Sequence, residues 1–232
     1  MKIGILQTGH MPEEMKDDMG DYAQMFARLL QGHGFDYVDY YVVDGKFPAS
    51  VDEADGWLIT GSKHGVYEDH PWIPPLEALI RDIRDAGKPL IGVCFGHQII
   101  AQALGGKVEK FAGGWVAGPT TYDVQGREMT LNAWHQDQVL TLPEGAEVIA
   151  SNDFCENAGL VIGDTILTIQ PHPEFTAEFI SGLIKYRAPG LLPDQMIADV
   201  NRDMDKPLDD QGFASMMAAF FAQADAKKGN AA

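Results

Sequence analysis

The chain has 232 residues, of which 45% are hydrophobic and 22% charged, a composition typical of a folded globular protein. Its 17 basic and 34 acidic residues give a net charge of −17, which disfavours binding to nucleic acid or to anionic membranes. Two cysteines, Cys94 and Cys155, are too few for a disulfide framework, and no signal peptide or membrane-length apolar run is evident. We therefore expect a soluble, cytoplasmic protein.

The first half of the chain alternates short apolar runs with amphipathic patterns of helical spacing. These patterns predict strands at 2–6, 37–43, 56–60 and 89–93 and helices at 19–31, 75–86 and 96–104. Because strands that alternate with helices favour parallel pairing, we expect an α/β fold with a doubly wound, mostly parallel sheet of the flavodoxin-like kind.

The second half begins with strand-like runs rather than helices. Between 107 and 168, β-rich runs are separated by turn residues, which predicts an antiparallel extension of the sheet. Helices are expected at 175–186, 194–204 and 209–223, followed by a polar end, 227–232, that frays. We interpret residues 1–187 as one domain and residues 188–232 as its C-terminal helical extension.

The segment around Cys94 carries the strongest chemical signal. The sequence GVCFG at 92–96 lies between an apolar strand and a helix, which is the arrangement of a nucleophile elbow with cysteine as the nucleophile. The sharp turn exposes the central side chain, and the N-terminus of the following helix favours the thiolate. The N–H of Phe95 is then placed to bind a developing oxyanion. Outside such a context a cysteine is a small buried hydrophobe, which is our interpretation of Cys155.

A second signal is the sequence QPHPEF at 170–175, between an apolar strand and a helix. Because the carboxyl ends of parallel strands gather at one edge of a sheet, His172 can reach Cys94. Glu174 can then accept a hydrogen bond from the other imidazole nitrogen and fix the tautomer. Two alternatives remain, which are local capping and metal ligation by His172 and Glu174, although no third ligand has suitable spacing.

Together, the cysteine elbow and the PHPE sequence resemble the class I, triad-type glutamine amidotransferase family over residues 1–187. Gly61 follows the third predicted strand, where this family places the glycine of its oxyanion hole. The sequence WHQDQV at 134–139 resembles the family's glutamine-pocket segment, S-H-x-D-x-V. The substrate-binding residues that the resemblance implies are Gln98, His135, Gln136 and Asp137.

The resemblance also implies a mechanism. Cys94 attacks a side-chain γ-carboxamide, and His172, oriented by Glu174, transfers a proton to the leaving ammonia or amine. The N–H groups of Gly61 and Phe95 stabilise the tetrahedral oxyanion, and water then releases the γ-glutamyl thioester.

The sequence does not specify which γ-glutamyl substrate or which partner protein the chain binds. Neither a P-loop nor a complete dinucleotide fingerprint is present, so we expect no cofactor and no built-in synthetase. The first hypothesis is a free-standing hydrolase of glutamine or of a γ-glutamyl peptide or amine. The second is a glutaminase subunit that supplies ammonia to a separate synthetase. The third is a non-catalytic binding or regulatory relative, which the intact cysteine, histidine and glutamate disfavour.

Other polar features are interpreted as structural. Four histidines are scattered along the sequence, so we assign no metal ligand among them: His10, His64, His70 and His97. Trp134 stands where the family's pocket segment begins with serine. We therefore expect the wall at the amino-acid end of the substrate to differ from that of other members.

Overall fold

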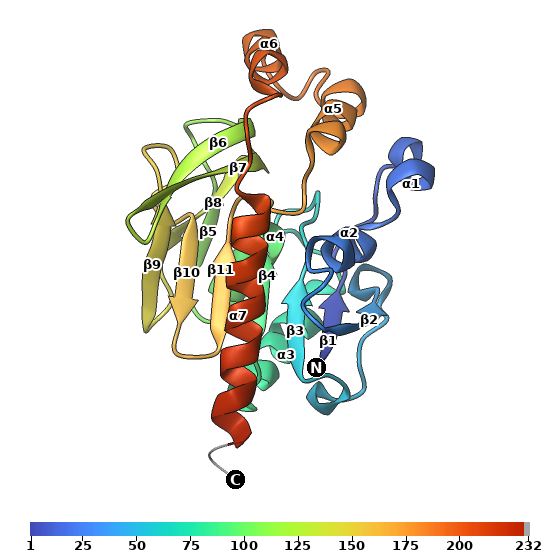
Figure 1. Ribbon diagram of the computed structural model, residues 1–232, viewed down its shortest axis with the longest axis vertical. Helices are drawn as coiled ribbons and strands as arrows, with labels where there is room; N and C mark the ends of the chain where they lie inside the picture. The colour runs from blue at the N-terminus through green and yellow to red at the C-terminus, as the bar shows by residue number, and fades with distance from the viewer. Residues whose placement is uncertain (230–232) are drawn as a thin grey trace.

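The computed structural model describes residues 1–229, and the side chains of the last helix as far as residue 223. Within this part of the chain, nine strands form one mixed sheet in the order β2-β1-β3-β4-β11-β10-β9-β6-β7 (Figure 1). The first five strands in this order are parallel, as in the 2-1-3-4-5 sheet of flavodoxin-like folds. They are β1 (Lys2–Leu6), β2 (Asp36–Tyr40), β3 (Gly56–Ile59), β4 (Leu90–Val93) and β11 (Ile166–Ile169).

The other four strands of the large sheet pair antiparallel, so the predicted antiparallel extension is confirmed. They are β6 (Val116–Val124), β7 (Arg127–His135), β9 (Ala146–Ser151) and β10 (Gly159–Ile162). A separate two-stranded sheet pairs β5 (Lys107–Lys110) with β8 (Asp137–Thr141). The sequence patterns did not predict β8 as a strand, because it is short and begins with two polar residues.

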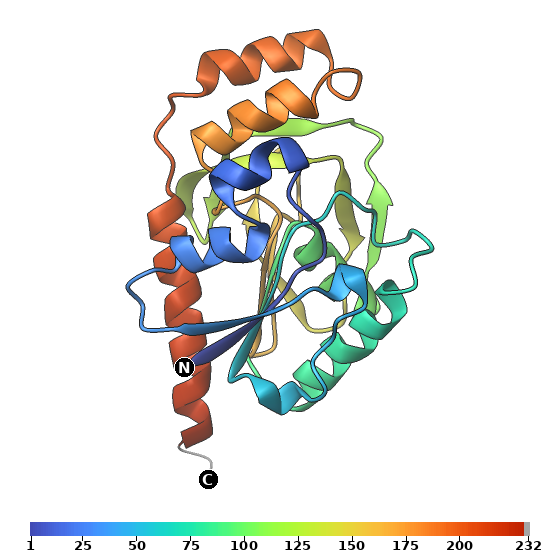
Figure 2. The same cartoon turned by 90° about the vertical axis from the view of Figure 1, so that its right-hand side faces the viewer.

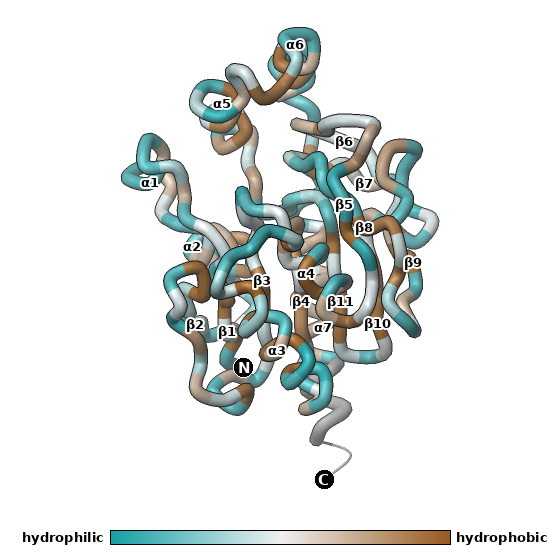
Figure 3. Tube along the Cα trace, turned by 180° about the vertical axis from the view of Figure 1, so that it is seen from behind, coloured by the Kyte–Doolittle hydropathy of each residue, from teal (hydrophilic) through white to brown (hydrophobic). Residues whose placement is uncertain are grey.

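Helices cover both faces of the parallel strands (Figure 1). On one face lie α2 (Tyr22–Leu29) and α7 (Asp210–Gly229), which bury Phe26, Phe213 and Phe221 in one apolar cluster. On the other face lie α3 (Ile73–Asp85) and α4 (Phe95–Ala103), which bury Ile80 and Ile100 in a second cluster. Figure 3 shows the hydrophobic central strands between these layers. Because each face of the parallel strands is covered by a layer of helices, nearly every residue of β1, β3, β4 and β11 is buried.

Three further helices gather beyond the carboxyl ends of the parallel strands (Figure 2). They are α1 (Glu13–Met19), α5 (Ala177–Tyr186) and α6 (Asp194–Asp203). Met15, Phe179 and Val200 meet in a third apolar cluster, which ties these helices together. The helices therefore stand over the sheet edge at which a functional site is expected.

The predicted helix at 19–31 is wrong at its start. The chain turns at Gly20, which has φ 76°, and begins α2 only at Tyr22. Asp21 caps this helix in a capping box with Gln24, which fixes the new N-terminus. The short acidic helix α1, which the sequence patterns did not predict, precedes the turn.

Two other boundaries also differ from the predictions. The strand predicted at 37–43 ends at Tyr40, and Val42–Asp44 forms a 3-10 turn that ends at Gly45 with φ 75°. The backbone of α7 continues to Gly229, beyond the helix end predicted at 223, and the fraying predicted from 227 stays a prediction. Residues 230–232 of the predicted frayed end lie outside the described residues.

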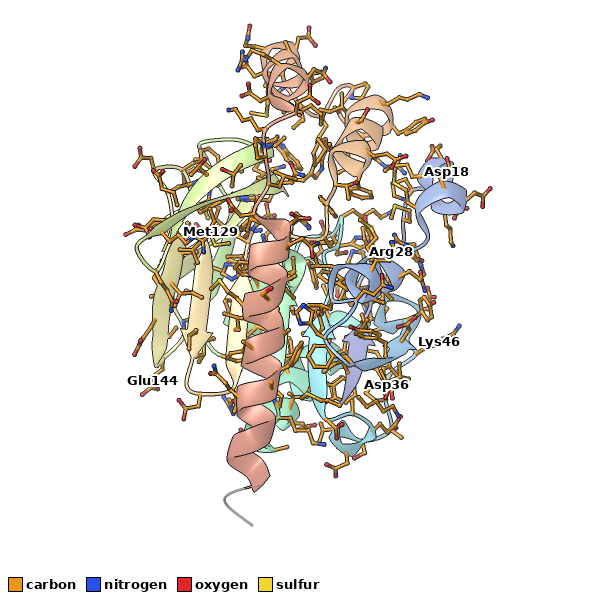
Figure 4. The ribbon with its side chains drawn as sticks, viewed as in Figure 1. Asp18, Arg28, Asp36, Lys46, Met129 and Glu144 are labelled. Carbon is orange, nitrogen blue, oxygen red and sulfur yellow. The ribbon has the colours of Figure 1, made fainter. Side chains whose placement is uncertain are left out.

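Two of the labelled acidic side chains lie at the periphery of the molecule. Figure 4 shows Asp18 on α1 and Glu144 near the opposite edge of the sheet, and both are exposed. Among the helices of the described residues, none is long and apolar enough to cross a membrane.

Candidate active site

The turn between β4 and α4 holds Cys94 in an unusual backbone conformation. Cys94 has φ 52° and ψ −102°, in a region that residues with side chains rarely adopt. Glycines are required on both sides, because a Cβ at Gly92 would lie 2.5 Å from the Gly96 oxygen and one at Gly96 would lie 2.4 Å from the Ile59 oxygen. The chain therefore has the elbow geometry that the GVCFG sequence predicts, with Cys94 at the N-terminus of α4.

His172 is fixed through its backbone and through one face of its ring. It follows β11, and its N–H donates to the Asn132 carbonyl oxygen on β7 at 2.8 Å. Asn132 Nδ2 in turn donates to the Phe175 carbonyl oxygen at 2.8 Å. The Phe175 ring stacks on the imidazole with their centroids 3.8 Å apart. The position of the imidazole therefore depends on the antiparallel part of the sheet as well as on the parallel part.

Cys94, His172 and Glu174 form a buried chain of contacts. The His172 ring and the Cys94 side chain both adjoin Gly61, and His172 Nδ1 lies 2.7 Å from Glu174 Oε1. The three residues are only 6%, 4% and 5% exposed, respectively. Burial alone would lower the pKa of His172, but the negative charges of Glu174 and Cys94 outweigh it and raise this pKa to about 10. This electrostatic environment favours a protonated His172, the imidazolium, at neutral pH.

Gly61 adjoins the same pair from the loop after β3. A Cβ at Gly61 would lie 2.9 Å from His172 Cε1 and 3.7 Å from Cys94 Cβ. The Thr8 hydroxyl lies 3.0 Å from the carbonyl oxygens of both Thr60 and Gly61, which holds this loop in place. Both residues predicted for the oxyanion hole, Gly61 and Phe95, therefore lie next to Cys94.

A cavity of about 560 Å³ opens over Cys94. The predicted site residues that line it are Gly61, Cys94, Gln98, His135, Gln136, Asp137 and His172. Phe95 and Glu174 do not line the cavity, but Phe95 follows Cys94 in the chain and Glu174 is bonded to His172. The fold thus brings all of the predicted residues into or directly beside one cavity.

Hydrogen bonds within the protein hold the predicted substrate-binding side chains. Gln98 Nε2 donates to the Asp137 carbonyl oxygen at 2.9 Å and to Gln170 Oε1 at 3.0 Å, which leaves Gln98 Oε1 as the atom available to a substrate. Burial raises the pKa of the Asp137 carboxyl, while a hydrogen bond from Tyr67 opposes that shift. Burial lowers the pKa of His135 to about 3, so its imidazole is neutral.

The cavity has a second wall that the sequence motifs did not reveal. Side chains of the segments around α1, α2, β7 and α5 form this wall, and they include Met11, Tyr22, Trp134, Leu183, Arg187 and Leu191. Arg187 belongs to no motif, and its position depends on where α5 ends. In the sequence, Trp134 was notable only because it replaces the serine that begins the family's pocket segment.

The expectation that the four histidines are scattered is wrong for two of them. The rings of His64 and His70 have centroids 4.2 Å apart. Both approach Glu68 Oε2, His64 Nδ1 at 3.3 Å and His70 Nε2 at 2.8 Å. Among the described residues these three form the group that could hold a metal ion, whereas His172 and Glu174 belong to no such group.

Most of the chain matches one protein family. Residues 18–179 match the family model described as Glutamine amidotransferase class-I. The chain belongs to the class I glutamine amidotransferase family. Among its relatives in this family, γ-glutamyl peptidase 4 of Arabidopsis thaliana is 35% identical over 190 residues, which cover 74% of this chain and 75% of that protein.

Other family members differ in length. A glutamine-hydrolysing GMP synthase of Clostridium acetobutylicum is 30% identical over 67% of this chain, but the match covers only 31% of that protein. A solved glutamine amidotransferase from Thermotoga maritima superposes with a TM-score of 0.77 at 18% identity, covering 96% of this chain and 98% of the other. This structural likeness confirms the flavodoxin-like α/β fold that was predicted for this chain.

Proposed function

We propose that this class I family member hydrolyses γ-glutamyl amide bonds, with Cys94 as the nucleophile, His172 as general acid and base, and Glu174 as the orienting carboxylate. The observation that carries the proposal is the position of His172, which lies beside Cys94 at Gly61 and has its Nδ1 2.7 Å from Glu174 Oε1. A nucleophile, a base within reach and a third group that orients the base are the parts that covalent acyl transfer needs.

In the first half-reaction, Cys94 Sγ attacks the amide carbon and negative charge develops on the carbonyl oxygen. The N–H groups of Gly61 and Phe95 donate to that oxygen, and the positive end of α4 adds to the stabilisation. As the C–N bond breaks, the His172 imidazolium gives its proton to the leaving nitrogen. Ammonia or an amine departs, and a γ-glutamyl thioester remains on Cys94.

In the second half-reaction, the neutral imidazole of His172 takes a proton from water, whose oxygen attacks the thioester carbon. The C–S bond breaks, the thiolate of Cys94 leaves, and the γ-carboxyl group of glutamate is released and loses its remaining proton to solvent. His172 is again an imidazolium beside the thiolate, so the site returns to its starting state. Glu174 keeps one ring orientation through both steps.

The substrate class that best fits the cavity is a γ-glutamyl peptide or amine. A cavity of about 560 Å³ lies within the range of about 300–1,000 Å³ that is common for ligands larger than one amino acid. The glutamyl part would lie beside the segment His135–Asp137, and the leaving amine beside the wall that contains Tyr22, Trp134 and Arg187. The activity named for the Arabidopsis relative, a γ-glutamyl peptidase, supports the same substrate class.

A second candidate is hydrolysis of free glutamine to supply ammonia to a separate synthetase. The similarity to part of a glutamine-hydrolysing GMP synthase favours it. In this case the turnover of glutamine by the chain alone would be slow and would rise when the synthetase is added. Hydrolysis of peptides by the chain alone therefore distinguishes the two candidates.

Glutamate release by the purified chain from a γ-glutamyl dipeptide, with glutamine as the second substrate, tests the proposal. We expect hydrolysis of the dipeptide without any partner, and a loss of at least about 10³-fold in Cys94→Ala. Cys155→Ala is the matched control, because Cys155 is also buried but does not line the cavity.

Two outcomes would count against the proposal in different ways. Dipeptide hydrolysis that survives Cys94→Ala would contradict the assigned nucleophile. No glutamate release from either substrate, with the protein folded, would contradict hydrolysis by the chain alone and would leave the partner-dependent glutaminase or the non-catalytic relative.

A further inference from the structure

The loop between β3 and α3 brings three metal-ligating side chains together. His64 Nδ1 and His70 Nε2 lie 3.3 Å and 2.8 Å from Glu68 Oε2, and one ligand atom from each residue lies within 4.8 Å of the others. Around a tetrahedral zinc ion with bonds of about 2.0–2.2 Å, ligand atoms are about 3.4 Å apart. The separation of 3.3 Å from His64 is close to this value, whereas the 2.8 Å from His70 is a hydrogen-bond distance that must widen when an ion enters. Small side-chain rotations would do this and complete the coordination.

Trp72 holds both imidazoles in this arrangement. Its indole is only 6% exposed and stacks on His70, with centroids 5.8 Å apart and the rings 15° from parallel. His64 meets the same indole edge-on, with centroids 5.9 Å apart. One buried aromatic side chain therefore fixes two of the three ligands before any ion binds, which reduces the entropy that binding costs.

The backbone of the loop is also anchored. The Glu68 N–H donates to the Gly65 carbonyl oxygen at 3.1 Å, and the His70 N–H donates to the Glu68 carbonyl oxygen at 2.9 Å. Gln102 on α4 donates through Nε2 to the Val66 carbonyl oxygen at 2.8 Å. These bonds hold the loop backbone in one conformation and thereby fix the positions from which the three side chains extend.

A cation can enter the group without a net change in its protonation. In the present arrangement each imidazole can donate a proton to Glu68 Oε2 from its nearer nitrogen. An ion would take the place of these two protons if each ring moved its proton to its other nitrogen, Nε2 of His64 and Nδ1 of His70. Both nearer nitrogens then offer lone pairs, and the carboxylate supplies a negative charge to the ion.

We propose that His64, Glu68 and His70 form a binding site for a divalent transition-metal ion of the zinc class. Two imidazoles and one carboxylate suit zinc, whereas magnesium and calcium prefer sets of oxygen ligands. Three protein ligands leave the fourth position of a tetrahedral ion open to water. Because His64 and Glu68 also line the active-site cavity, the bound ion would lie beside the space that a substrate occupies.

Titration of the full chain with Co²⁺, followed by its visible absorption, tests the site, with Zn²⁺ as the competitor. The parent for every measurement is Cys94→Ala, since Cys94 and His172 together are a second place where these ions could bind. We expect one equivalent of Co²⁺ in a four-coordinate spectrum without a thiolate band, displaced by one equivalent of Zn²⁺. The melting temperature should rise with either ion, because the ion binds the folded chain preferentially.

Three further variants in the same parent locate the ion. His70→Gln should weaken binding by about tenfold or more, and Glu68→Gln should do the same while it keeps the size of the side chain. His33→Gln is the matched control, because His33 is exposed and belongs to no such group. Melting without metal checks that each variant is folded.

The proposal fails if Co²⁺ shows no saturable binding below millimolar concentration. It fails equally if His70→Gln and Glu68→Gln bind as tightly as His33→Gln. Because the parent lacks the proposed nucleophile, neither result bears on the hydrolytic activity.

Discussion

The Tyr67 hydroxyl donates to Asp137 Oδ2 at 2.9 Å and thereby joins the loop after β3 to the first residue of β8. Both residues line the cavity, and Tyr67 is 50% exposed, so the bond lies at the mouth. The loop that begins at Gly61 and the segment that resembles the family's glutamine pocket are therefore linked into one wall. The substrate-binding role proposed for Asp137 depends on this link.

Tyr67→Phe should raise the KM for a γ-glutamyl substrate by about tenfold and leave kcat nearly unchanged. The Tyr67 hydrogen bond lowers the pKa of Asp137 against the effect of burial, so its loss should raise that pKa. The acidic limb of the plot of KM against pH should then move to higher pH. Tyr37→Phe on β2 is the control, because Tyr37 does not line the cavity. Equal KM values in the two variants would contradict the link.

Gly61→Ala should lower kcat/KM by at least about tenfold with little loss of folded protein. The added Cβ would lie 2.9 Å from His172 Cε1, so either the imidazole or the loop must move away from Cys94. Gly212→Ala is the matched control, since its Cβ would meet only Met129 at an ordinary 3.4 Å and alanine favours a helix. Steady-state kinetics and melting of both variants decide the prediction, and unchanged activity in Gly61→Ala would contradict it.

Glu174→Gln should lower kcat by about 10²–10⁴-fold while the chain stays folded. The amide keeps the shape of the carboxylate but removes the negative charge that helps to raise the pKa of His172. A neutral imidazole no longer places a positive charge beside Cys94 Sγ, so alkylation of Cys94 by iodoacetamide at neutral pH should also slow. Alkylation at the wild-type rate would show that Glu174 does not act through His172.

The stability of the chain should depend on pH through His172. Its pKa is raised from 6.5 to about 10 in the folded chain, so the folded state binds this proton more tightly than the unfolded state. The stabilisation is fully present below pH 6.5 and is lost as the pH rises through about 10. The free energy of unfolding, measured in urea, should therefore fall across this interval, and less steeply in His172→Gln. An equal slope in His172→Gln and in the control His33→Gln would contradict the assignment.

The parallel strands and the elbow were predictable because each has a local cause. Four of the five parallel strands are apolar runs bounded by turn residues, and the elbow at Cys94 needs glycines that are visible at 92 and 96. Helix starts were less predictable, since the break before α2 depends on the positive φ of Gly20 and on a cap by Asp21. An amphipathic pattern alone continues through such a break.

Contacts made by loops could not be predicted from spacing. His64 and His70 meet because the loop turns back over Trp72, and nothing in the order of these residues specifies that turn. Arg187 reaches the cavity only because α5 packs with α1 through the cluster around Phe179. The cavity residues that belong to sequence motifs were therefore predicted, whereas those brought to the cavity by tertiary packing, such as Arg187, were not.

Arg187→Ala should separate two classes of γ-glutamyl substrate. Arg187 lines the cavity wall beside which we propose that the leaving amine lies, and its guanidinium pairs with Glu14 at 3.5 Å and remains 45% exposed. A dipeptide carries a terminal carboxylate on its leaving amine, and a guanidinium binds carboxylates well. The kcat/KM for a γ-glutamyl dipeptide should therefore fall by about tenfold, while that for glutamine or for a γ-glutamyl alkylamine, which lacks this carboxylate, stays unchanged.

Arg202→Ala is the matched control for this variant, since Arg202 lies on α6 and does not line the cavity. The ratio of the dipeptide and alkylamine values of kcat/KM removes any general effect on folding or on the catalytic residues. If kcat/KM falls equally for the dipeptide and the alkylamine in Arg187→Ala, the guanidinium supports the wall but does not bind the carboxylate of the leaving group. If only the dipeptide value falls, the wall built by α5 selects peptides because Arg187 binds their carboxylate.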